Sequence, residues 1–296
     1  MENKIKVAIQ KSGRLSEDSY ALLKSIGIKF NRSKDQLIAY GTNYPIEVLL
    51  TRDDDIPTLV NEGTCDIGIV GKNVFEEFKL ESIAKGNSLN IDEIYKLPYG
   101  SCRLSFAVPE KSNLNSLEDF SGKKIATSYP NIVNNFLKEN NINAGFIEFK
   151  GSVEIAPKLG TCDLICDLVS TGTTLRANGL IEVQTLLQST AEIYAYRNIS
   201  QIKSNLVNTF IERVNAVIKA SNARYIMLHA PKAKVEKIVS LIPGSESPTI
   251  IPLTNIEDKV AVHALCIEEI FWETLEDLKA EGATSILVLP IEKILD

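Results

Sequence analysis

The sequence predicts an α/β protein with two lobes and a small C-terminal domain. Short, strand-like apolar runs alternate with segments of helical spacing, which is typical of mainly parallel sheets covered by helices. A polar, loop-like stretch soon after Cys102 separates a first group of such units from a second. From Arg224 onward the expected order becomes β-α-β-β-α-β, which is the ferredoxin-like unit.

The first lobe begins with an alternating strand at 4–10, followed by a loop at 11–15. We expect Ser16 to cap the next helix and Gly27 to end it, because these residue types favour the two ends of a helix. The other elements expected here are a strand at 46–50, a helix with Pro57 in its first turn, a buried strand at 66–71 and a helix from about Asn73.

The second lobe is expected to start near Cys102. Its predicted elements are strands at 103–108, 124–127 and 146–149, a helix at 132–139 and a helix opened by 151–154. We expect this lobe to close after the loop around Gly172, so that the strand-like run 181–187 returns the chain to the first lobe. Two lobes joined by chain crossings enclose a cleft, where small ligands usually bind. The predicted domains are 1–101 together with 181–220, then 102–180, then 221–296.

A long amphipathic helix is predicted between Leu206 and Ile218, where apolar residues recur at helical spacing. Core packing explains this stripe without a cofactor. The C-terminal domain then has predicted strands at 225–228, 249–253, 260–266 and 286–289 and predicted helices at 232–241 and 268–279. An appended domain of this order is regulatory or oligomerising, and the order alone does not decide between the two.

The composition is that of an ordinary globular protein of 296 residues with a net charge of −6. An acidic chain argues against nonspecific binding to nucleic acid, and no apolar run approaches the length of a membrane span. The N-terminal residues do not resemble a secretory signal. The 5 cysteines are scattered, which fits reduced thiols and a cytoplasmic location. With only 2 histidines in the chain, Cys162 and Cys166 are interpreted as structural residues rather than metal ligands.

The stretch from 162 to 175 is the strongest functional signal in the sequence. A strand-like run ends at the acidic Asp167, and a dense group of hydroxyls around one glycine follows, made of Ser170, Thr171, Gly172, Thr173 and Thr174. Leu175 then starts a possible helix. Hydroxyls, free N–H groups and a helix N-terminus suit a phosphate, while a carboxylate suits a sugar diol. The pattern therefore predicts a phosphoribosyl substrate. The alternative is an ordinary turn and cap, but this many hydroxyls exceeds what a cap requires.

Nine segments together give the chain a resemblance to the long form of ATP phosphoribosyltransferase, the first enzyme of histidine biosynthesis. The resemblance covers nearly the full length. The segments are 10–16, 52–57, 66–71, 100–104, 125–130, 151–154, 163–175, 225–231 and 285–293. Each is weak alone, but their order and spacing match the family. Cys162 departs from the very small residue expected there, and cysteine is itself small.

The resemblance implies two lobes like those of type II periplasmic binding proteins and a C-terminal allosteric domain. It implies a Mg²⁺-dependent condensation of ATP, at adenine N1, with phosphoribosyl pyrophosphate, which gives N1-(5-phosphoribosyl)-ATP and pyrophosphate. It also implies feedback inhibition by histidine and a homodimer that assembles into hexamers.

The candidate site residues are assigned from their side-chain chemistry and from the family resemblance together. Asp167, Arg14 and Lys11 are the candidate catalytic residues, with Asp167 holding the ribose hydroxyls and stabilising positive charge on the ribose. Adenine N1 is already nucleophilic, so orientation matters more than a strong base. Phosphoribosyl pyrophosphate is assigned to Asp167, Ser170, Thr171, Gly172, Thr173, Thr174 and Leu175. ATP is assigned to Lys11, Gly13, Arg14, Leu15 and Gly71, and histidine to His229 and Thr249, which are expected at one edge of the C-terminal sheet.

Four alternatives stay open at this stage. Taken alone, Lys11 and Arg14 are ordinary solvated cations. The acidic run 53–55 is interpreted as a helix cap in preference to a Mg²⁺ site. A nucleotide-salvage phosphoribosyltransferase needs an acidic pair before its loop, but Cys166 precedes Asp167 here. A two-lobe solute-binding protein with a regulatory tail is disfavoured by the absence of a signal peptide. The protein ligands of Mg²⁺ are not predicted.

Overall fold

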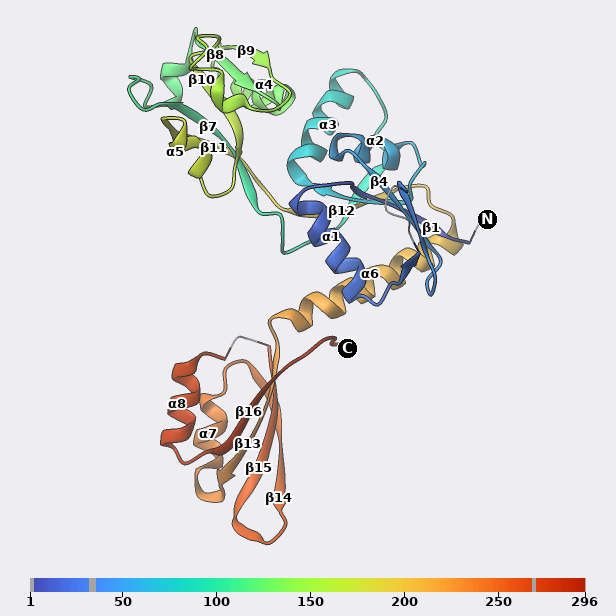
Figure 1. The fold of residues 1–296 in the computed structure, drawn as a ribbon, viewed down its shortest axis with the longest axis vertical. Helices are drawn as coiled ribbons and strands as arrows, with labels where there is room; N and C mark the ends of the chain where they lie inside the picture. Colours follow the sequence, from blue (N-terminus) through green and yellow to red (C-terminus); the bar gives the residue numbers. More distant parts are fainter. Residues whose placement is uncertain (1–2, 32–35, 268–269, 296) are drawn as a thin grey trace. The chain divides into compact units, whose positions relative to one another are not determined.

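The computed structural model describes residues 3–31, 36–267 and 270–295. The chain divides into two compact units, Met1–Val207 and Asn208–Asp296, with the break inside helix α6 (Gln201–Ser221). The first unit contains two sheets and the second contains one (Figure 1).

The first sheet has the strand order β2-β3-β4-β1-β5-β12-β6. Its strands are β1 (Ile5–Gln10), β2 (Phe30–Asn31), β3 (Ile38–Gly41), β4 (Ile46–Thr51), β5 (Ile67–Gly71), β6 (Ile91–Lys96) and β12 (Ala191–Tyr196). Three helices accompany them, α1 (Arg14–Ser25), α2 (Ile56–Asn61) and α3 (Lys72–Ala84). Strand β1 pairs in parallel with β4 and β5, so its carboxyl end meets theirs at one edge of the sheet. All five residues of β5 are buried, as the apolar run predicts.

Helix α1 begins earlier than expected. Its N-cap is Gly13 and not Ser16, because the Gly13 carbonyl already accepts hydrogen bonds from the N–H groups of Ser16 and Glu17. Ser16 lies buried inside the first turn. The predicted end is confirmed: Gly27 has φ +82°, and the Ile28 N–H donates to the Leu23 carbonyl. These are features of a Schellman motif, which favours glycine.

The second sheet has the order β11-β7-β10-β8-β9. Its strands are β7 (Cys102–Pro109), β8 (Lys124–Thr127), β9 (Gly145–Glu148), β10 (Leu164–Val169) and β11 (Leu180–Ser189), and its helices are α4 (Pro130–Glu139) and α5 (Thr173–Ala177). The segment 151–154 forms a short 3₁₀ turn, Val153–Ile155, instead of opening an α-helix. Both sheets are mixed rather than mainly parallel, since β12 and β7 run antiparallel to their neighbours.

The chain returns to the first sheet later than expected. Residues 181–187 lie in β11, which pairs antiparallel with β7 along the second sheet, and only β12 joins the first sheet. The crossing is therefore at Thr190. The chain first crosses from the first sheet to the second between β6 and β7. This crossing contacts the return crossing, because the Ala191 N–H donates to the Tyr99 carbonyl at 3.0 Å. Long-range pairing with β7 places β11 in the second lobe, and this pairing leaves no signal in the β11 sequence.

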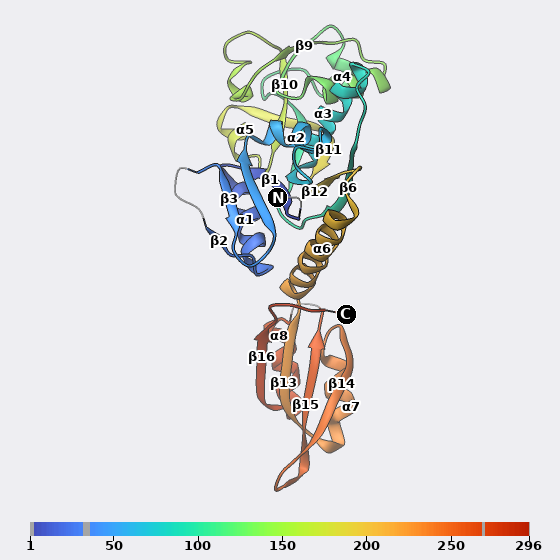
Figure 2. The same ribbon diagram turned by 90° about the vertical axis from the view of Figure 1, so that its right-hand side faces the viewer.

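The second unit has the predicted β-α-β-β-α-β order. It contains β13 (Arg224–Pro231), α7 (Val235–Leu241), β14 (Ser245–Leu253), β15 (Ile256–Cys266), α8 (Trp272–Ala280) and β16 (Thr284–Pro290). The strands lie in the order β14-β15-β13-β16, visible in Figure 2, and every pairing is antiparallel. Residues 268–269 of the expected last helix lie outside the described residues. Inward residues such as Leu228, Val262 and Leu278 form its core.

No helix within the described residues is both long enough and apolar enough to cross a membrane.

Candidate functional site

Three cavities of the first unit lie where its two lobes meet. The first, here called the cradle cavity, has a volume of about 330 Å³ and is lined by Gln10, Arg14, Leu15, Asp53, Gly71, Asn73, Val74, Gly100, Ser101, Cys102, Tyr129, Leu168 and Ser170. The second, the seam cavity, has about 600 Å³ and shares Asp53, Val74 and Tyr129 with it. Both volumes are typical of small-molecule sites.

The cradle cavity brings together residues that the sequence analysis assigned to two different substrates. Arg14, Leu15 and Gly71 reach it from the first lobe, and Ser170 reaches it from the second. The position of Arg14 follows from β1, whose carboxyl end delivers the loop to the ligand-binding edge expected for an α/β sheet. Lys11 and Gly13 are exposed on the same loop but are not among the lining residues. Asp167 and residues 171–175 are also outside the lining.

The cradle loop, residues 170–174, adopts the conformation that its glycine predicts. Gly172 has φ +74°, and α5 begins directly after it. The hydroxyls of Thr171 and Thr173 share a hydrogen bond of 3.0 Å, and both side chains are exposed. Leu175 instead packs in the core of the second lobe, so it anchors the loop rather than facing a ligand.

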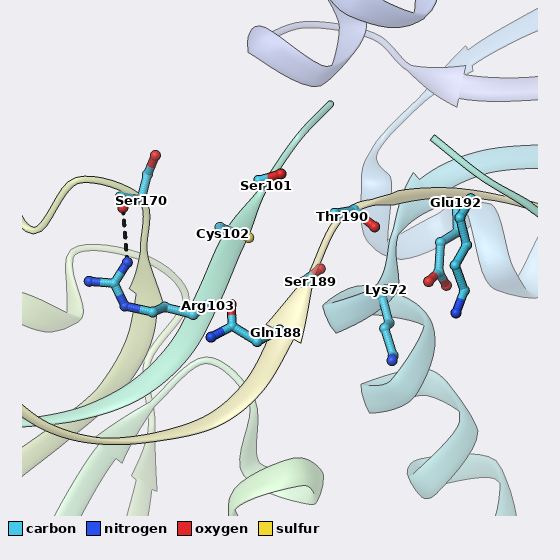
Figure 3. A pocket seen from close by; sticks show the side chains of 10 residues that line it. Lys72, Ser101, Cys102, Arg103, Ser170, Gln188, Ser189, Thr190 and Glu192 are labelled. Atoms are coloured by element: carbon cyan, nitrogen blue, oxygen red, sulfur yellow. Dashed lines mark hydrogen bonds between the residues drawn. The ribbon is translucent and has the colours of Figure 1, made fainter. Parts of the chain in front are cut away.

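Two arginines that the sequence analysis did not single out hold this loop. The Arg176 Nη2 donates to the Thr171 carbonyl at 3.2 Å, and a Cβ on Gly172 would lie 3.1 Å from the Arg176 Nη1. On the other side, the Arg103 Nη1 donates to the Ser170 carbonyl at 3.1 Å (Figure 3). Arg103 is itself held by a two-point ion pair with Glu182 of β11. Spacing does not reveal these contacts, since 67 residues separate Arg103 from Ser170.

A third cavity, the hinge cavity shown in Figure 3, lies beside the cradle cavity. It has a volume of about 330 Å³ and shares Ser101, Cys102 and Ser170 with the cradle cavity. Its lining includes the side chains of Lys72 and Glu192. Burial raises the pKa of the Glu192 carboxyl, while Lys72 and Lys96 act in the opposite direction.

Asp167 has an unusual electrostatic environment. Burial raises the pKa of its carboxyl to about 6, and the nearby Glu154 adds to the rise. The Leu168 N–H donates to the Asp167 Oδ1 at 2.8 Å and partly offsets it. A half-buried carboxylate with a raised pKa is a common property of functional sites.

The acidic run 53–55 forms a short 3₁₀ turn, and Asp55 is the N-cap residue of α2 as expected, although its side chain makes no capping hydrogen bond. Asp53 and Asp54 instead line the seam cavity together with Arg52 and Lys150. Burial, followed by Asp53 and Asp55, raises the pKa of Asp54. Arg52 is a further cation at the site that the spacing alone did not assign.

Within the described residues, no group of three or more His, Cys, Asp or Glu side chains is arranged to hold a metal ion. Mg²⁺ usually keeps several waters and binds one or two carboxylates together with substrate phosphates. Asp53 at both cavities therefore fits an ion that arrives on a phosphorylated substrate, rather than one held by the protein alone.

Tyr129 and Asn73 are the central residues that the sequence analysis left without a role. Tyr129 lines both the cradle and seam cavities, and its hydroxyl accepts a hydrogen bond of 2.8 Å from the Asn73 Nδ2. Burial raises the pKa of Tyr129, and the carboxylates of Asp167, Asp53 and Asp54 raise it further. The only signal for Tyr129 was its place in the segment 125–130.

The two candidate histidine-binding residues lie in the second unit. His229 pairs with Ala261 on β15, and Thr249 pairs with His263 on the same strand. Because residues two apart on a strand share a face, His229 and Thr249 lie on one face of the sheet. They do not lie at one edge, since β15 separates β13 from β14, which puts them at least about 10 Å apart.

Comparison with known proteins agrees with this architecture. The family model described as ATP phosphoribosyltransferase matches residues 52–216, and the one described as HisG, C-terminal domain, matches residues 220–293. A solved structure titled as the ATP phosphoribosyl transferase (HisG:HisZ) complex from Thermotoga maritima is 29% identical, with a TM-score of 0.60, and the match covers 71% of this chain and 96% of that one.

A second solved structure is similar in fold alone. The periplasmic aliphatic sulphonate binding protein SsuA from Escherichia coli is 15% identical with a TM-score of 0.50, and the match covers 72% of this chain and 73% of that one. The expected two-lobe fold of periplasmic-binding-protein type is thereby confirmed. The family models together span both units, and the chain belongs to the ATP phosphoribosyltransferase family, whose members act in histidine biosynthesis.

Proposed function

We propose that this protein condenses ATP with phosphoribosyl pyrophosphate, joining adenine N1 to the ribose and releasing pyrophosphate. The observation that carries the proposal is the cradle cavity, where Arg14, Leu15 and Gly71 of the first lobe, assigned to ATP, and Ser170 of the second lobe line one space. Family membership supports the same reaction.

The cradle loop is proposed to hold the 5-phosphate of phosphoribosyl pyrophosphate. The hydroxyls of Thr171, Thr173 and Thr174, the backbone at Gly172 and the N-terminal N–H groups of α5 supply the donors. Arg176 adds a positive charge next to Gly172. Asp167 is proposed to accept hydrogen bonds from the ribose hydroxyls and to stabilise the positive charge that develops on the ribose.

ATP is proposed to bind the first-lobe loop through Lys11, Gly13, Arg14 and Leu15. Arg14 lines the cradle cavity and Arg52 lines the seam cavity, and Asp53 lines both. These cations offset the charge of the leaving pyrophosphate. Gly71 lies at the cavity wall, where a Cβ would approach the Asn73 Oδ1 to 2.4 Å, so a larger residue would displace Asn73.

Mg²⁺ is proposed as the required ion, with Asp53 as the side chain best placed to contact it. When bound, the ion neutralises phosphate charge. The protein's own contribution is to hold the two substrates in line, because an already nucleophilic adenine nitrogen needs position more than a base.

The second unit is proposed to bind histidine as a feedback inhibitor through His229 and Thr249. The protein is further proposed to form a homodimer that assembles into hexamers. These proposals rest on the C-terminal family match and on the expected family properties.

The reaction itself is tested by mixing the protein with ATP, phosphoribosyl pyrophosphate and Mg²⁺ and following absorbance. The N1-ribosylated adenine is expected to absorb more strongly than ATP. Omission of each component in turn is the control. Turnover of a free purine base in place of ATP would favour a salvage enzyme, and ligand binding without any turnover would favour a solute-binding protein.

A further inference from the structure

The hydrogen bonds around Asn73 form a directional chain that ends at the Tyr129 hydroxyl. Asn73 and Ser189 are 5% and 3% exposed, so their polar atoms depend on each other rather than on water. The Asn73 backbone N–H donates to the Ser189 Oγ at 3.1 Å. The Ser189 hydroxyl donates in turn to the Asn73 Oδ1 at 2.8 Å.

This pair of bonds fixes which way the Asn73 amide faces. The Ser189 hydroxyl has one proton to donate, and in the structure the Asn73 Oδ1 accepts it. The Asn73 Nδ2 therefore faces Tyr129 and can only donate to the Tyr129 oxygen, at 2.8 Å. The hydroxyl proton of Tyr129 can therefore be donated to another acceptor.

Tyr129 is held in place from both lobes. It precedes α4, and the side chain of Glu77 accepts hydrogen bonds from the N–H groups of Asn131 and Ile132 in the first turn of that helix. Asn73 and Glu77 are four residues apart on α3, so one face of α3 contacts both Tyr129 and the start of α4.

The hydroxyl of Tyr129 makes no second hydrogen bond with any residue that the structure describes. It lies at two cavities, and Arg14 and Ser170 at the cradle cavity are also donors. Donors from both lobes favour an anionic oxygen between them. We propose that Asn73 is a positioning residue, which with Ser189 fixes the Tyr129 hydroxyl as a hydrogen-bond donor to a phosphate oxygen of the substrate. This proposal rests on the proposed function for the identity of the substrate.

The test reverses the last hydrogen bond without removing it. In Asn73→Asp the introduced carboxylate is ionised near neutral pH (about 7 to 8) and can only accept hydrogen bonds. Both Ser189 and Tyr129 then donate to it. Tyr129→Phe removes the hydroxyl outright. Each variant is expected to bind the ligand roughly 10- to 100-fold more weakly, which is the effect of one hydrogen bond to a charged group.

The double variant separates the proposed chain from simple charge repulsion. Asn73→Asp is expected to have no further effect on binding when Tyr129 is already Phe, because the chain acts only through the hydroxyl. Repulsion by the new carboxylate would weaken binding equally in both backgrounds and would overturn the proposal. Asn134→Asp on α4, away from the cavity linings, is the matched control and should leave binding unchanged.

Binding is measured by calorimetry with two probes, each with Mg²⁺: phosphoribosyl pyrophosphate and inorganic diphosphate. Thermal midpoints check that each variant is folded. If the wild-type protein binds diphosphate alone, the proposed function fails, and the variants still test the Tyr129 donor. If the wild-type protein binds both probes and the variants do so equally well, the roles of Tyr129 and Asn73 are overturned and the proposed function stands. If it binds neither probe, both proposals fail.

Discussion

At the scale of single residues, the site depends on polar groups that the fold keeps partly out of water. Asp167 shows this most clearly, because burial raises its pKa to about 6. A group whose folded-state pKa lies above its ordinary value near 4 costs stability when it ionises. The cost is absent below about pH 4 and complete above about pH 6. A carboxylate that lowers stability when ionised is consistent with a role for its negative charge in the reaction.

Asp167→Asn is expected to keep the fold and to lose about 100-fold or more in turnover, since a neutral amide stabilises positive charge poorly. Wild-type turnover should rise with pH through about 6 as the Asp167 carboxyl ionises, and the variant should lack this rise. Steady-state rates from pH 5 to 8 measure both effects. The thermal midpoint near pH 7.5 should be equal to or above that of the wild type. A variant with near wild-type rates would remove Asp167 from the mechanism.

At the scale of elements, α3 connects the two lobes through side chains. Its Glu77 accepts hydrogen bonds from the Asn131 N–H at 2.8 Å, the Asn131 side chain at 2.7 Å and the Ile132 N–H at 2.9 Å. A carboxylate from the first lobe thus satisfies the N-terminal N–H groups of α4 in the second, where α4 has no side-chain cap of its own. The meeting of the lobes is therefore specified by charge as well as by apolar packing.

Glu77→Gln is expected to lower the free energy of unfolding by about 1 to 2 kcal/mol, because the amide offers one acceptor and no charge to these N–H groups. Chemical denaturation measures this loss. Glu81→Gln is the matched control on the same helix, since Glu81 forms a solvent-exposed ion pair with Lys85 and its substitution should change stability by less than about 0.5 kcal/mol. Equal losses in the two variants would mean that the α4 contact contributes nothing specific.

At the scale of the whole molecule, we propose catalytic and regulatory roles for separate units of one chain. Inhibition at a distance requires that histidine bind two states of the protein with different affinity. The open face of the C-terminal sheet carries His229 and Thr249 together with Tyr225 and His263, whose side chains lie 3.3 Å apart between the hydroxyl oxygen and Nδ1.

Thr249→Ala is expected to raise the histidine concentration needed for inhibition several-fold and to leave uninhibited turnover unchanged. Thr249 is exposed, so its truncation should have little effect on stability. Inhibition curves at fixed substrate concentrations give the comparison, and Thr254→Ala in the β14–β15 turn is the control. If histidine competes directly with ATP, and its effect survives changes at both Thr249 and His229, the assignment of this face is wrong.

The sequence by itself determined the features whose causes are local. The β-α-β-β-α-β order, the end of α1 at Gly27 and the left-handed turn at Gly172 each follow from a few adjacent residues. The family segments also supplied candidate ligand residues, of which Arg14, Leu15, Gly71 and Ser170 line one cavity in the structure.

Only the tertiary structure decided the features that join distant parts of the chain. Asn73 lies 56 residues from Tyr129 and 116 from Ser189, so no spacing rule relates them. Strand β11 was expected in the first lobe, but pairing with β7 keeps it in the second. Local residues fix backbone conformation, whereas burial and long-range hydrogen bonding depend on which segments the fold places side by side. This is why the cradle loop was readable in the sequence and the residues that orient its surroundings were not.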